Sequence, residues 1–246
     1  MSGGPGDVPS TAATHRRAVS CVLGLAVLLG PLAAVLAACG DDPASPRAAG
    51  PRLVSVLGQG SEHATGFAVA PARVVTVAHA LAGGGAVRVR VGGAMRLPVG
   101  GAPPVRAGGA SRAARVLRVD RRADLALLAV PGLPARAART ASAGDDENAM
   151  VLVLRSGHAA ALGATVRRAI DARVSAPGPG RPLRRSALEL EVRTRAGDSG
   201  APVVTEDGEV TGVVFARSRN EAGTAYAVDA RALGDFLAGA GGEGGG

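Results

Sequence analysis

The sequence predicts an all-β protein that is built as β-barrels and ends in one short helix. From residue 52 onward, short runs rich in Val and Leu recur between Gly- and Pro-containing breaks. Residues 87–91 (VRVRV) and 188–192 (LELEV) alternate strictly, as half-buried strands do. Only residues 230–238 carry apolar side chains at helical spacing. Many short strands with a single terminal helix favour barrels over a parallel α/β sheet.

The strands are expected on both sides of a linking segment, 131–148, which has no apolar period. Asp229 should cap the final helix, whose buried face carries Leu233, Phe236 and Leu237. Expected strands before the link are 53–57, 66–70, 74–77, 87–91, 114–119 and 125–130, with loops at 81–85 and 98–110. Expected strands after it are 150–154, 164–170, 173–175, 188–192, 202–205, 210–216 and 226–228, with a loop at 176–186 and a hairpin turn at 206–208.

Composition narrows the function classes. Aromatic residues make up only 2% of the 246 residues, so Val, Leu and Ala must form the core. The net charge is +8, but the arginines are scattered with almost no aromatics between them, and nucleic-acid binding is not expected. A basic surface near anionic lipid or wall polymer is the milder inference. The four histidines show no ligand spacing with each other or with cysteine, so neither a metal nor a cofactor is expected.

The N-terminal segment predicts export. Two arginines precede an apolar stretch, 18–38, which ends in small residues, as secretory signals do. Residues 36–40 (LAACG) resemble the bacterial lipobox, which implies a signal peptide over 1–38 and a lipid on Cys39. The chain is then expected on the outer face of the bacterial cell membrane, with residues 39–51 as a flexible tether. Cleavage without lipidation, giving a secreted protein, and an uncleaved single-pass helix are the alternatives.

Ser199 is the candidate nucleophile. It lies between glycines in residues 197–200 (GDSG), ahead of an apolar strand, and the amides of Gly197 and Ser199 could both face an oxyanion. A serine needs a base and an acid to react. His79 at the end of one expected strand and Asp124 at the start of another are the candidates. The alternative interpretations are a plain turn for Ser199, a structural histidine at a strand end for His79, and a turn cap for Asp124.

Three motifs in order resemble those of trypsin-like serine peptidases of the disulfide-free bacterial type. They are residues 76–79 (TVAH), 124–128 (DLALL) and 197–200 (GDSG). The resemblance covers residues 52–238 and implies two six-stranded antiparallel barrels, about 52–135 and 149–238, with a cleft between them and a disordered tail at 239–246. It also implies Ser199 as nucleophile, His79 as general base, Asp124 as the group that orients it, and the amides of Gly197 and Ser199 as the oxyanion hole.

The chain departs from the family pattern at three points. Ala201 stands where a second glycine is usual, and Asp198 has no obvious partner in the sequence. Nothing after Arg47 or Arg52 matches the family's new N-terminus, so activation by the familiar cleavage is not expected.

The expected specificity pocket is formed by Arg193, Thr194, Phe215 and Ala216. No acid lies in 192–196, so cleavage after Arg or Lys is not indicated. A small or apolar residue is expected instead, with Arg193 and Arg195 leaving an acidic preference open.

These observations together predict a lipid-anchored serine endopeptidase that cleaves protein or peptide substrates through an acyl-enzyme. An esterase or amidase with the same triad is one alternative, because the chemistry is shared. A non-catalytic envelope binding or scaffold protein is the other. The oligomeric state is not predicted by any feature of the sequence.

Overall fold

The computed structural model describes residues 49–58, 61–96, 105–106, 111–174 and 182–239. The predicted signal peptide, Cys39, the tether up to residue 48 and the tail from residue 240 lie outside these residues. No helix within the described ranges is both long and apolar enough to cross a membrane.

The first six-stranded unit is a closed antiparallel barrel. Its strands neighbour one another in the order β1-β2-β3-β7-β6-β4, and Leu53, Phe67 and Leu125 fill its interior with no exposed surface. A short 3-10 turn, η1 (Ala78–Leu81), follows β3. The strands are β1 (Ala49–Gly58), β2 (Ser61–Ala70), β3 (Arg73–Val77), β4 (Val87–Arg96), β6 (Ser111–Asp120) and β7 (Leu125–Ala129).

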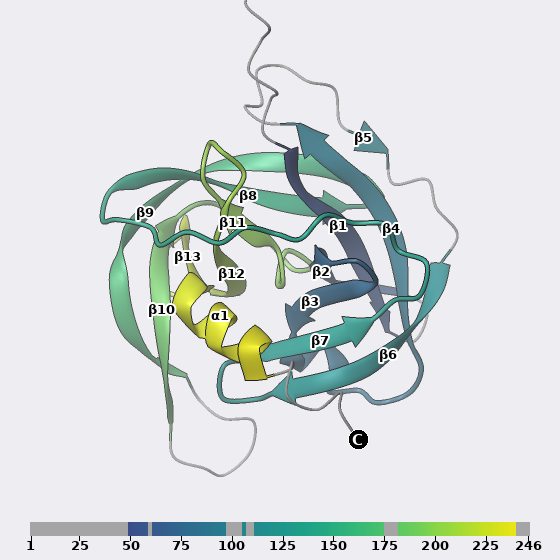
Figure 1. Cartoon of the computed structure of the whole chain (residues 1–246). Coiled ribbons are helices and arrows are strands. Elements are labelled where there is room, and N and C mark those ends of the chain that lie inside the picture. The colour runs from purple at the N-terminus through teal and green to yellow at the C-terminus, as the bar shows by residue number, and fades with distance from the viewer. Residues whose placement is uncertain (1–48, 59–60, 97–104, 107–110, 175–181, 240–246) are drawn as a thin grey trace, which may run out of the picture. The chain divides into compact units, whose positions relative to one another are not determined.

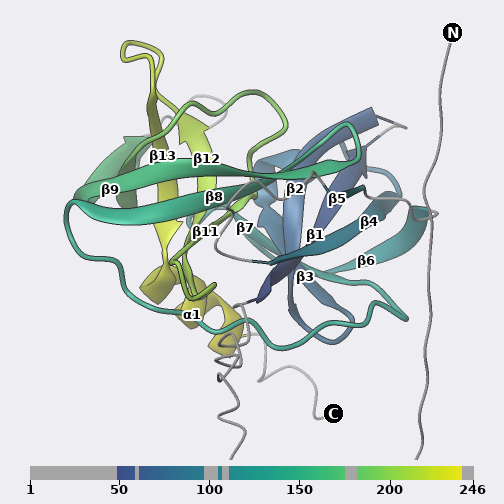
Figure 2. The same ribbon diagram turned by 90° about the horizontal axis from the view of Figure 1, so that it is seen from above.

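The second unit is a sheet whose six main strands also close into a ring. They follow the order β10-β13-β12-β11-β8-β9, and β9 pairs back onto β10. The two groups of strands lie side by side in both views (Figures 1 and 2). The predicted pair of six-stranded barrels is therefore confirmed. The strands are β8 (Glu147–Arg155), β9 (His158–Val174), β10 (Leu183–Glu191), β11 (Pro202–Val204), β12 (Val210–Arg217) and β13 (Thr224–Asp229).

Several strands differ from the sequence prediction. β1, β8 and β10 begin earlier than expected, inside the predicted tether at 39–51, the link at 131–148 and the loop at 176–186 respectively. β9 is one 17-residue strand where two, at 164–170 and 173–175, were expected. Its first half pairs with β8, which extends the strand back through residues 159–163, mostly Ala and Gly with little strand preference of their own. Its second half pairs with β10, which carries the strand across residues 171–172. β5 (Val105–Arg106) falls within the expected loop at 98–110 and pairs with β9.

Helix α1 (Ala230–Gly239) begins as predicted. Asp229 Oδ1 accepts a hydrogen bond from the Ala232 amide at 2.7 Å, which satisfies a donor that the helix leaves free. Leu233 and Phe236 are buried against the second unit. Arg118 of β6 donates to the Phe236 carbonyl at 3.0 Å and lies over the Phe236 ring, so the helix also contacts the first barrel.

Candidate active site

His79 and Asp124 are joined at one edge of the first barrel. His79 lies in η1 directly after β3, and Asp124 directly precedes β7, the strand that pairs with β3. Nδ1 of His79 lies 2.8 Å from Oδ2 of Asp124, and the His79 amide donates to Oδ1 at 2.9 Å. Protonation at Nδ1 leaves Nε2 as the acceptor. The His79 side chain is 47% exposed, so solvent can reach the imidazole ring that carries Nε2.

Asp124 is held in an uncommon backbone conformation. Its φ is +60°, a left-handed value that Asp tolerates better than most residues. Its carbonyl accepts a hydrogen bond from the Ala78 amide at 3.0 Å, so backbone and side chain both bind the segment that carries His79. The orientation of His79 therefore follows from the pairing of β3 with β7.

The loop that carries Ser199 is bonded to the first barrel. The carbonyl of Ser199 accepts the Thr65 amide at 2.8 Å, and the Thr65 hydroxyl donates to the Gly197 carbonyl at 3.0 Å. Thr76, three residues before His79, donates its hydroxyl to the Thr65 carbonyl at 2.8 Å. The loop between β10 and β11 is thus attached to β2, and through it to the strand that leads to His79.

Gly200 allows this close approach. Its φ is +85°, and a Cβ placed on it would lie 2.0 Å from the Thr65 carbonyl oxygen and 2.7 Å from the Thr76 hydroxyl. Any side chain here would push the loop away from β2 and β3. The glycine after Ser199 is therefore required by the contact between the two barrels, in addition to the turn.

Asp198 has a partner that the sequence did not reveal. Arg155, the last residue of β8, donates to it through Nε at 2.9 Å and through Nη2 at 2.5 Å. The Arg195 amide adds a third hydrogen bond at 2.8 Å, and Asp198 has no exposed surface. The two-pronged geometry is the strong form of an arginine–carboxylate pair. Hydrogen bonding to Asp198 raises the pKa of Arg155 above its usual value.

The amides of Gly197 and Ser199 differ from those of their neighbours. The amides of Asp198, Gly200 and Ala201 donate to the carbonyls of Arg195, Val214 and Asp198 respectively. No hydrogen bond to another described residue engages the amide of Gly197 or of Ser199. Two free N–H groups flanking the serine are what an oxyanion requires. No hydrogen bond joins Ser199 to His79 among the described residues, and such contacts often form only with substrate bound.

A buried arginine, Arg185, lies next to Asp124. Nη1 of Arg185, in β10, is 3.6 Å from Oδ2 of Asp124, and Nε donates to the Arg122 carbonyl at 2.9 Å. Its guanidinium lies over the ring of Phe215 at 4.5 Å. Burial lowers the pKa of Arg185, and the charges of Asp124 and Asp120 oppose this effect. Nothing in the Arg-rich segment 181–185 distinguished this residue in the sequence.

A small pocket of about 70 Å³ opens beside Ser199. Of the four residues expected to form it, Thr194 and Ala216 lie in its wall. Phe215 does not, because successive side chains of β12 point to opposite faces and that of Phe215 packs under Arg185. Arg193 lines a separate hollow. The pocket is lined by Thr194, Arg195, Ala196, Asp198, Ser199, Val214, Ala216 and Arg217.

The described residues do not suggest a metal centre. No three His, Cys, Asp or Glu side chains among them gather closely enough to hold an ion.

Two antiparallel barrels with a histidine–aspartate pair beside a serine loop can be compared with known protein families. The family model of the trypsin-like peptidase domain matches residues 64–213. This match covers more than half of the chain, which therefore belongs to the trypsin-like peptidase family.

Particular relatives follow from two further comparisons. Serine protease Rv3671c of Mycobacterium tuberculosis strain H37Rv and serine protease MT3772 of strain CDC 1551 are each 32% identical over 214 residues, 83% of this chain. The match spans 47% of those relatives, so the chain corresponds to about half their length. The crystal structure of the active form of Rv3671c matches with a TM-score of 0.63 and 30% identity, over 76% of this chain and 80% of that one.

An inactive form of Rv3671c gives the same TM-score at 30% identity, over 78% of this chain and 89% of that one. The protease domain of MamO from Magnetospirillum magneticum matches with a TM-score of 0.60 at 19% identity, over 78% of this chain and 96% of that one. The latter supports the fold alone.

Proposed function

We propose that this chain is a serine endopeptidase in which Ser199, His79 and Asp124 form the catalytic triad. The observation that carries the proposal is the hydrogen-bonded pair of His79 and Asp124, next to strands that also hold the Ser199 loop. A histidine oriented through Nδ1 by a carboxylate presents a basic Nε2, which is what a neighbouring serine needs. Membership of the trypsin-like peptidase family supports the same assignment.

The reaction would proceed in two halves. Ser199 Oγ attacks the carbonyl carbon of the scissile peptide bond while His79 Nε2 takes the hydroxyl proton. His79 then donates this proton to the departing amine nitrogen, and the C–N bond breaks to leave an ester on Ser199. Water attacks the ester with His79 again as the base, which releases a carboxylic acid product and restores the serine.

The protein's role beyond the triad would be electrostatic. Negative charge develops on the carbonyl oxygen of the tetrahedral intermediate, and the free amides of Gly197 and Ser199 would donate hydrogen bonds to it. The ion pair of Asp198 with Arg155 would hold the loop in the conformation that presents these amides. Asp124 would stabilise the imidazolium that forms on His79 during each proton transfer.

Two other functions remain as alternatives. An esterase or amidase would use the same groups, and only the substrate distinguishes it. A non-catalytic envelope binding or scaffold protein would keep the fold with an unreactive serine. The preserved pairing of His79 with Asp124 favours an enzyme over the scaffold.

The location of the protein is a further part of the proposal. We infer from residues 36–40 that Cys39 is lipidated and holds the peptidase on the outer face of the bacterial cell membrane. Membrane fractionation of cells that express the Cys39→Ala variant tests this directly. Unchanged membrane association would contradict lipidation as the anchor.

A fluorophosphonate probe, which reacts with activated serines, tests the triad. We expect the folded protein to be labelled, Ser199→Ala to lose the label, and His79→Ala to react much more slowly. Ser218→Ala is a matched control, because this serine lies in an exposed turn where its hydroxyl accepts backbone amides. Absence of labelling in the wild type would contradict the proposal that the protein is an enzyme. If the wild type is labelled, matched peptide and ester substrates would separate a peptidase from an esterase.

A further inference from the structure

The pocket beside Ser199 is lined by two arginines that have no acidic partner among the described residues. Arg195 lies in the loop before Ser199, and Arg217 ends β12 on the other wall. Both residues are exposed, and neither forms an ion pair with any residue that the structure describes. Their guanidinium groups are therefore available to a ligand.

Several other arginines of the same sheet are paired. These ion pairs join neighbouring strands or hold a loop, so the arginines in them stabilise the fold. The pairs are Arg155 with Asp198, Arg167 with Glu191, Arg168 with Glu189, and Arg184 with Asp171. Arg173 and Arg193 also form no ion pair with a described residue, so what distinguishes Arg195 and Arg217 is their place in the wall of the Ser199 pocket.

The one acid in the wall of the pocket does not cancel their charge. Asp198 has no exposed surface, and its carboxylate accepts hydrogen bonds from Arg155 and from the Arg195 amide. Arg155 supplies the balancing positive charge. The pocket therefore has a net positive charge from Arg195 and Arg217, which favours an anionic group.

The size and the remaining walls favour a short side chain. A single water needs roughly 10–15 Å³ of such cavity space, so about 70 Å³ accommodates a handful of heavy atoms. Val214 and Ala216 supply apolar contacts for a methylene group, and Thr194 supplies a hydroxyl. A carboxylate on one or two methylenes combines these features, whereas a basic side chain would be repelled by the two arginines.

We propose that Ser199 cleaves after acidic residues, with the aspartate or glutamate side chain bound between Arg195 and Arg217. This inference rests on the proposed peptidase function and names its substrate class. Of the two preferences that the sequence left open, a small or apolar residue and an acidic one, it selects the acidic one. Arginine is suited to the task, because its planar fork binds carboxylates with two hydrogen bonds.

The test compares peptides that differ only in the residue before the scissile bond: Asp, Asn, Glu, Gln, Ala or Leu. We expect kcat/KM to be at least about tenfold higher for Asp than for the isosteric Asn, since a hydrogen bond to a charged group is stronger than one to a neutral group. The ratio should fall about tenfold in Arg217→Gln and in Arg195→Gln, and Arg217→Lys should retain part of it. High salt should weaken the preference, because both arginines are exposed.

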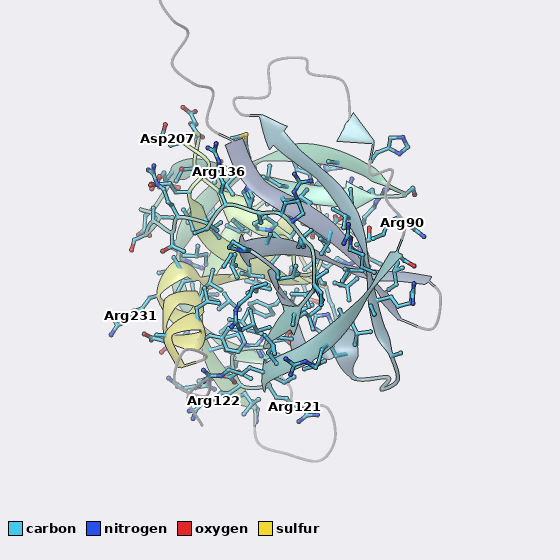
Figure 3. All side chains as sticks on the ribbon, turned by 45° about the vertical axis from the view of Figure 1, so that its right-hand side comes forward. Arg90, Arg121, Arg122, Arg136, Asp207 and Arg231 are labelled. Carbon is cyan, nitrogen blue, oxygen red and sulfur yellow. The ribbon has the colours of Figure 1, made fainter. Side chains whose placement is uncertain are left out.

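Arg231→Gln is the matched control, because Arg231 points outward from α1 (Figure 3) and does not line the pocket. Fluorophosphonate labelling of every variant reports the triad independently of the side chain in the pocket. Normal labelling with equal cleavage of the Asp and Asn peptides, or with Ala or Leu preferred, would overturn the acidic preference and leave the peptidase proposal standing. A wild type without labelling would overturn both.

Discussion

Replacing Arg155 with Met tests how the loop that presents the oxyanion amides is held. Met has a similar length but no charge and no donor. In the variant the carboxylate of Asp198 loses the hydrogen bonds from Nε and Nη2 and keeps only the Arg195 amide. Because Asp198 has no exposed surface, water cannot replace the lost donors without opening the loop.

The magnitude follows from the burial of the two partners. Removing one partner of a buried ion pair costs about 3–5 kcal/mol, because the other charge is left unpaired. The Arg155 side chain is 23% exposed, so we expect the lower end, about 3 kcal/mol. That is a large part of the 5–15 kcal/mol by which domains are typically stable. Arg155→Lys keeps the charge without the fork and should lose less.

The effect should not depend on pH near neutrality. Pairing raises the pKa of Arg155 in the folded protein above its unfolded value. The stabilisation from its charge is then fully present below the unfolded pKa and is lost only as the pH rises through the higher folded pKa. Both lie far above the range in which a peptidase is assayed, so the loss in Arg155→Met should be the same at pH 7 and pH 9.

Urea unfolding provides the measurement, with the midpoint and the slope fitted separately. Arg139→Met is the control, because Arg139 also pairs with an acid, Glu209, but its side chain is 77% exposed. We expect no measurable change in the control. Fluorophosphonate labelling of the folded fraction should also slow in Arg155→Met. If Arg155→Met unfolds at the same urea concentration as the control, the ion pair does not stabilise the loop and the reasoning is refuted.

Three further variants test other contacts. Gly200→Ala should lower the free energy of unfolding in urea by about 3 kcal/mol, because the new Cβ meets the Thr65 carbonyl oxygen at a left-handed φ. Gly197→Ala is the control, at φ +92° with open space around it, and should lower it by about 1 kcal/mol. Equal losses in the two variants would contradict the close approach at Gly200. Arg185→Met should lower kcat about tenfold with little change in KM, because Asp124, which orients His79, loses the positive charge beside it. If Arg185→Lys restores kcat fully, the planar guanidinium group has no role beyond its charge. Ala201→Gly should cost about 1 kcal/mol without slowing labelling, since the methyl group is buried in a well-packed cluster.

The local features of this protein were legible in the sequence because their causes are local. Alternating Val and charged residues favour strands with one buried face, and the side chain of Asp229 caps α1 by accepting an amide three residues later. Residues 76–79, 124–128 and 197–200 resemble, in that order, the motifs of trypsin-like serine peptidases, and this resemblance predicted the family and the two six-stranded barrels. Predictions of this kind depend on neighbours along the chain, which the sequence contains directly.

The tertiary structure alone decided which distant residues support the site. Arg155 lies 43 positions before Asp198, and Arg185 lies 61 positions after Asp124, within a chain where arginine is common and scattered. Composition could not distinguish these two from the arginines on the surface. Folding brings Arg155, at the end of β8, to Asp198, and brings Arg185, in β10, to Asp124. Both carboxylates are buried, and a buried carboxylate requires a donor or a positive charge beside it.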